Sequence, residues 1–92
     1  PGAQQEIAQG IVMNEEMKAR LIKLIADQAG CLLDDVKPDS KLVADLGMDS
    51  LDLIETCMAV EEEFEVMFKD EEADHCATVG DIMDLVVLKG GK

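Results

Sequence analysis

The sequence predicts a small all-α domain, with three main helices, one short helix and a long loop between the first two. Apolar residues recur every three or four positions in three segments, and capping residues or glycines bound those segments. No segment alternates apolar and polar residues as a half-buried strand does. A chain of 92 residues suffices for one domain with a modest core.

The first twelve residues are rich in Gln, Gly and Ala and show no sustained period. We interpret residues 1–12 as a flexible N-terminal extension or a cloning remnant, because Met13 would serve as a natural start. The folded domain is therefore expected to occupy residues 13–92.

The first helix is predicted between Asn14, a suitable N-cap, and Gly30, a suitable stop. Glu15 and Glu16 stand in its first turn, where the helix dipole favours acidic side chains. Residues at helical spacing predict one face of this helix: Met17, Leu21, Leu24, Ile25 and Gln28.

A long loop is predicted over residues 31–48. Pro38 disfavours helix in the residue before it, and Asp39 and Ser40 are typical of turns. A loop of this length in a small domain is usually functional or packed by its own side chains. We expect three apolar residues to fold back onto the core: Leu42, Val43 and Leu46.

The second helix is predicted from Ser50 to Phe64, with Asp49 as N-cap and Asp52 completing a capping box. At about 100° per residue, one stripe is expected to face the core: Leu53, Cys57, Val60 and Phe64. The opposite side carries Leu51 and Met58 flanked by Glu55 and Glu62, with Ile54 and Glu61 at the border. Apolar residues set among carboxylates indicate a surface that docks a basic partner.

After this helix, we expect a turn over residues 65–69 and a short helix over residues 70–75. Thr78 is the predicted cap of the last helix, with Asp81 at capping-box spacing, although Gly80 weakens the first turn. Lys89 and the glycines after it end that helix. Its buried stripe is predicted to contain Val79, Ile82, Met83 and Val86.

The net charge is −13, from 21 acidic and 8 basic residues, and no basic residue lies between Lys41 and Lys69. This charge makes nucleic acids and anionic membranes poor partners and favours proteins with Lys/Arg patches. No stretch is long and apolar enough for a membrane span, and none has the pattern of a signal peptide. We therefore expect a cytoplasmic protein that does not insert into membranes.

Cys31, Cys57 and Cys76 are odd in number and lack metal-site spacing, which indicates a reducing compartment. Cys57, and by extension the other two, is interpreted as a small core residue. The run from Asp45 to Asp49 does not match the EF-hand calcium loop. No metal site is therefore predicted.

Ser50 is expected in the first turn of the second helix, where free N–H groups and the helix dipole favour a phosphate attached to its hydroxyl. A serine at this position is usually only a cap or a surface residue. A hydrolase nucleophile elbow would need glycines where Met48 and Asp52 stand. The single histidine, His75, lies in an acidic segment and is expected at the surface, so we predict no catalytic residue and no enzyme.

The run Asp45-Leu46-Gly47-Met48-Asp49-Ser50-Leu51-Asp52 resembles the acyl carrier proteins of dissociated, bacterial-type fatty-acid synthases and related pathways. The likeness extends from about residue 14 to residue 87. It implies a four-helix bundle of acyl-carrier type and covalent 4′-phosphopantetheine on Ser50, transferred from coenzyme A by a phosphopantetheinyl transferase. The attached thiol would carry acyl groups as thioesters. Asp49 matches the acidic residue that helps the transferase to recognise the serine.

The resemblance also implies a monomer that docks basic-faced synthases and acyltransferases. The residues matching the family's docking surface are Leu51, Ile54, Glu55, Met58, Glu61 and Glu62. Several positions depart from the family pattern and predict a pocket less suited to long saturated chains: Leu42, Thr56, Phe68, Lys69 and Cys76. Among these, Thr56 replaces a large aliphatic residue that would face the acyl cavity.

Three functions remain open from the sequence. The leading hypothesis is an acyl carrier for fatty-acid synthesis or for a specialised lipid or polyketide pathway. An aminoacyl or peptidyl carrier is disfavoured by the strong acidity around Ser50. A docking module without a prosthetic group is the third, and it would keep its activity after Ser50→Ala.

Overall fold

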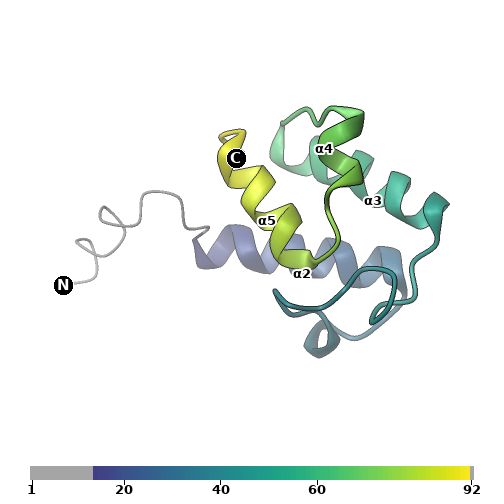
Figure 1. The fold of residues 1–92 in the computed structure, drawn as a ribbon. Coiled ribbons are helices and arrows are strands. Elements are labelled where there is room, and N and C mark those ends of the chain that lie inside the picture. Colours follow the sequence, from purple (N-terminus) through teal and green to yellow (C-terminus); the bar gives the residue numbers. More distant parts are fainter. Residues whose placement is uncertain (1–13, 92) are drawn as a thin grey trace.

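A computed structural model describes residues 14–91 of the chain. Its helical elements appear in Figure 1 and are, in chain order, α2 (Glu15–Ala29), η1 (Leu33–Asp35), α3 (Ser50–Phe64), α4 (Asp70–Asp74) and α5 (Val79–Leu88). The predicted all-α class is confirmed. Over the described range there is no strand, only an isolated antiparallel bridge between Lys41 and Thr78. The predicted extension, residues 1–12, lies outside the described residues.

The helix starts follow the predicted caps. The Asn14 Oδ1 accepts a hydrogen bond from the Met17 N–H at 2.8 Å. The Asp49 carboxylate accepts from the Asp52 N–H at 2.9 Å, and the Asp52 carboxylate accepts from the Asp49 N–H at 3.2 Å. These reciprocal bonds fix the residue at which α3 begins.

The core lies where α2, α3 and α5 meet, and Figure 1 shows α4 beside α3 at the side of the bundle away from α2. Leu21 and Ile25 of α2 are fully buried, as are Val60 and Phe64 of α3. The stripe predicted for α5 is confirmed, because all four of its members are buried: Val79, Ile82, Met83 and Val86.

The stripe predicted for α3 is partly wrong. Cys57 is only half-buried, whereas Thr56 is fully buried. The face toward the core therefore follows Leu53, Thr56, Val60 and Phe64, a rotation of one residue in the middle of the helix. Thr56 fits there because its hydroxyl lies 3.9 Å from the Met48 sulfur as a weak hydrogen-bond donor.

The loop before α3 packs as predicted at Leu42 and Leu46, which are buried, but not at Val43, which is 58% exposed. The chain turns at residues 42–46, with the Leu46 N–H donating to the Lys41 carbonyl at 3.0 Å. This turn directs Leu42 and Leu46 inward. Val43 lies between them and faces out.

Backbone hydrogen bonds fix the loop against the start of α5. The Leu42 N–H donates to the Ala77 carbonyl at 3.0 Å, and the Gly80 N–H donates to the Pro38 carbonyl at 2.8 Å. A Cβ at Gly80 would lie 2.9 Å from that Pro38 oxygen, so glycine is required where helix and loop approach. These bonds thus fix the position of the loop that precedes α3.

Candidate functional site

Ser50 is the first residue of α3 and is exposed. The two residues before the N-cap prepare its position. Gly47 adopts a left-handed conformation with φ 71°, which glycine accepts without strain. Met48 is buried in the core, and its N–H donates to the Leu42 carbonyl at 3.1 Å. The anchored Met48 and the capped Asp49 therefore hold the Ser50 hydroxyl at the surface.

The sequence contains four side-chain hydroxyls, and the structure separates Ser50 from the other three. Ser40 is buried, accepts a bond from the Lys37 N–H and donates to the Asp35 carbonyl. The three hydroxyls with structural roles are those of Ser40, Thr56 and Thr78. Within residues 14–91 the Ser50 hydroxyl makes no hydrogen bond, so it is available for modification.

The first turn of α3 suits a phosphate esterified to Ser50. The Asp52 N–H is bound by the Asp49 cap, whereas the Ser50 and Leu51 N–H groups have no acceptor among the described residues. These two donors lie next to the hydroxyl, at the positive end of the helix dipole. The residues present therefore fit a phosphate-linked group on Ser50.

A groove of about 590 Å³ runs between α3 and α4 and begins at Ser50; we call it the α3–α4 groove. Its apolar and thiol-bearing lining comes from both helices and the segments that follow them: Leu53, Ile54, Cys57, Met58, Phe68, Ala73 and Cys76. Three carboxylates complete the lining: Glu61, Asp70 and Asp74. Thr56 does not line this groove and is fully buried in the core.

Two cysteines line the α3–α4 groove, and their environment keeps both as neutral thiols. Burial raises the pKa of the Cys57 thiol, and the nearby Glu61 and Asp74 carboxylates raise it further. Burial is also the main cause that raises the pKa of Cys76 to about 11. The Cys76 thiol donates a weak hydrogen bond to the Glu72 carbonyl at 3.5 Å. Because the thiolate is the reactive form, a raised pKa slows the reaction of a thiol with electrophiles.

We therefore predict slow alkylation of Cys76. At pH 8 its rate with iodoacetamide should be on the order of a hundredfold below that of a free thiol of ordinary pKa, because only the thiolate reacts. Since its pKa is raised to about 11, the rate should keep rising about tenfold per pH unit from pH 8 to pH 10. Peptide-resolved mass spectrometry measures both. A plateau near pH 9 would contradict the raised pKa.

The six residues predicted to dock partners fall on one side of α3, and we call them the docking face: Leu51, Ile54, Glu55, Met58, Glu61 and Glu62. Leu51, Ile54 and Met58 are 57–62% exposed, unusually high values for large apolar side chains. Glu55 and Glu62 are exposed beside them. The structure thus brings the predicted apolar and acidic residues together.

Glu61 differs from the other members of the docking face. It is half-buried, and its carboxylate accepts a hydrogen bond from the Phe68 N–H at 2.7 Å. Its side chain therefore stabilises the segment after α3 through this hydrogen bond. No sequence pattern indicates this bond, because it joins residues seven positions apart across a turn.

Sequence reasoning missed Met67, which is 78% exposed. With Met58 it borders a pocket of about 520 Å³ at the end of α3; we call it the Met58–Met67 pocket. The available signal was the apolar run Val66-Met67-Phe68 within a turn. Such a run cannot be buried along its whole length when the chain is extended.

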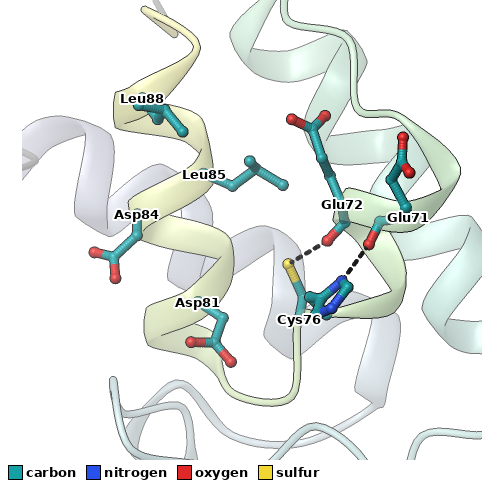
Figure 2. Close-up of a pocket in the computed structure, with 8 residues that line it drawn as sticks. Glu71, Glu72, Cys76, Asp81, Asp84, Leu85 and Leu88 are labelled. Carbon is teal, nitrogen blue, oxygen red and sulfur yellow. Dashed lines mark hydrogen bonds between the residues drawn. The ribbon is translucent and has the colours of Figure 1, made fainter.

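Figure 2 shows a second groove, of about 380 Å³, between α4 and α5. His75 is exposed, as predicted, and is one of the residues that line this groove. Its Nδ1 lies 2.6 Å from the Glu71 carbonyl oxygen. At the same groove Glu72 pairs with Lys89 at 2.9 Å, and the Lys69 N–H, followed by Lys89, holds the pKa of Glu72 below its usual range. Within the described chain no hydroxyl or thiol is hydrogen-bonded to His75.

Among residues 14–91 no group of three or more His, Cys, Asp or Glu side chains is arranged to hold a metal ion. No helix in that range has the length and apolar character of a membrane span. Comparison with protein families matches residues 19–86 to the family described as "phosphopantetheine attachment site".

Proposed function

The chain belongs to the phosphopantetheine-attachment family, and from this premise we propose that it is an acyl carrier protein modified at Ser50. Domains of this family carry covalent 4′-phosphopantetheine and mark carrier proteins. Once attached, the group supplies a flexible arm whose terminal thiol holds acyl chains as thioesters. The family match covers α3 together with the loop before it and the helices around it.

The observation that supports this assignment best is the setting of Ser50. Its exposed hydroxyl is the one side-chain hydroxyl without a structural role among the four in the sequence. It lies beside two available N–H donors and at the start of the α3–α4 groove. The hydroxyl would become the ester oxygen, and the donors would stabilise the phosphate charge. Asp49 would remain the N-cap and add a carboxylate for the transferase to recognise.

The composition of the docking face favours binding to partners with basic surfaces. The exposed Glu55 and Glu62 would steer such enzymes by long-range attraction, and Leu51, Ile54 and Met58 would supply the apolar contact. We infer that these partners are a phosphopantetheinyl transferase and the synthases and acyltransferases of fatty-acid, related lipid or polyketide synthesis. We propose that the chain acts as a monomer in the cytoplasm.

The lining of the α3–α4 groove supports short or polar acyl groups over long saturated ones. The lining includes two thiols, Cys57 and Cys76, and three carboxylates: Glu61, Asp70 and Asp74. A long saturated chain gains most where methylene groups meet only apolar atoms. Carboxylates in the lining reduce that gain.

Acyl loading tests the proposal directly. Incubation with a promiscuous phosphopantetheinyl transferase and either acetyl-coenzyme A or palmitoyl-coenzyme A should give acylated proteins that neutral hydroxylamine cleaves. We expect the palmitoyl form to melt within about 2 °C of the acetyl form, since a gain of 1 kcal/mol would shift Tm by about 4–8 °C. Failure of both loadings would refute the carrier function. A large stabilisation by palmitoyl alone would refute only the chain-length preference.

A further inference from the structure

The segment that follows α3 is held in one conformation by Glu61. The Glu65 N–H and the Val66 N–H both donate to the Glu61 carbonyl oxygen, the latter at 3.0 Å. The Phe68 N–H donates to the Glu61 carboxylate at 2.7 Å. One residue of α3 thus binds the backbone on both sides of Met67.

The same segment directs Met67 outward. Val66 is buried in the core, and Phe68 is half-buried against it. Because successive side chains of an extended segment point to opposite sides, Met67 between them faces solvent and is 78% exposed. The exposure of Met67 therefore follows from the fixed conformation of this segment.

The Met58–Met67 pocket continues the docking face beyond the end of α3. Its lining consists of Met58, Ala59, Glu61, Glu62, Val66 and Met67. Methionine is unbranched and polarisable, and it adapts to apolar groups of different shapes. Glu62 is exposed at the pocket and makes no ion pair within the described chain. An occupant that matches this lining has an apolar side chain next to a positive charge.

We propose that the Met58–Met67 pocket receives an apolar side chain from the basic face of the phosphopantetheinyl transferase, while a Lys or Arg of that enzyme pairs with Glu62. The inference rests on the proposed carrier function and names a contact that the predicted docking residues did not include. Met67 is a specificity-determining contact, and Glu61 is a positioning residue that presents it.

Transferase kinetics with coenzyme A test the contact. Met67→Gln removes the apolar surface at nearly constant size and should raise KM about five- to tenfold at unchanged kcat. Leu88→Gln is the matched control, because Leu88 on α5 is 76% exposed and lies outside the docking face. We expect Leu88→Gln to keep the KM of the unchanged protein. Equal KM values for the two variants would overturn the proposal.

Two variants of Glu61 test its positioning role. Both variants remove the Glu61 charge from the docking face, but only Glu61→Gln keeps an oxygen acceptor for the Phe68 N–H. Glu61→Ala should therefore raise KM about threefold or more above the KM of Glu61→Gln. Circular dichroism checks that each variant is folded. If Glu61→Ala and Glu61→Gln have equal KM values, the positioning role is wrong.

Two further results would be distinct from a loss of the transferase contact: dimerisation of the chain through the pocket, and failure of the proposed carrier function. If the unchanged protein dimerises in sedimentation equilibrium and Met67→Gln does not, a second copy of the chain occupies the pocket and the proposal is overturned. If the transferase modifies no variant, including the unchanged folded protein, the proposed carrier function fails rather than the pocket.

Discussion

Replacing Ser50 with alanine is expected to reduce phosphopantetheine loading below detection while leaving the fold intact. The hydroxyl is exposed and makes no hydrogen bond in the described chain, so the free energy of unfolding should change by no more than about 0.5 kcal/mol. Loading is measured by intact mass after incubation with the transferase and coenzyme A. Folding is measured by urea denaturation.

Ser40→Ala provides the opposite control. Ser40 is the other serine of the sequence, and it is buried with hydrogen bonds to Lys37 and Asp35. Its loss should cost about 1–3 kcal/mol of stability but leave loading unchanged. A Ser50→Ala protein that still gains the group would remove the basis for assigning Ser50.

The second large effect is expected from charge reversal on the docking face. Glu55→Lys combined with Glu62→Lys should lower kcat/KM for the transferase about 10- to 100-fold at low salt, because a repulsive surface replaces an attractive one. The difference should shrink as ionic strength rises and screens the exposed charges. Kinetics at two salt concentrations measure both effects.

Glu71→Lys combined with Asp84→Lys is the matched control. It makes the same change in net charge with two exposed residues of α4 and α5. This protein should lose much less kcat/KM than the docking-face variant. Equal losses would mean that only total charge matters and that the docking face has no specific role.

The helix boundaries could be predicted because their determinants are local. Asn14, Asp49 and Thr78 each accept a hydrogen bond from the N–H three residues later, as their spacing indicated. The left-handed conformation of Gly30 ends α2 in the same local way. The position of Ser50 in the first turn of α3 followed from the Asp49 cap alone.

Errors arose where tertiary packing decides between neighbouring residues. The apolar stripe of α3 favoured Cys57 for the core, but the fold buries Thr56 instead, beside Met48 from a loop. Burial of the Thr56 hydroxyl is tolerated because the Met48 sulfur accepts a weak hydrogen bond from it. Sequence spacing does not reveal that partner. Val43 was misplaced for a related reason, because the turn of the loop sets which apolar residues face inward.

In the docking face, too, some features follow from local sequence and others depend on tertiary structure. Its exposed members, such as Leu51 and Glu55, followed from helical periodicity because both are on the side of α3 opposite the core. The structural role of Glu61 and the exposure of Met67 depend on the path of the chain after α3. That path is set by hydrogen bonds across the turn.

Fragmentation mass spectrometry of the unchanged protein, after incubation with coenzyme A and a promiscuous phosphopantetheinyl transferase, tests the central claim most directly. We predict a gain of one phosphopantetheine, and the fragment masses should locate the added group on Ser50. A gain on any other side chain would contradict the assigned site. The absence of any gain, in folded protein that was not already modified, would contradict the carrier function itself.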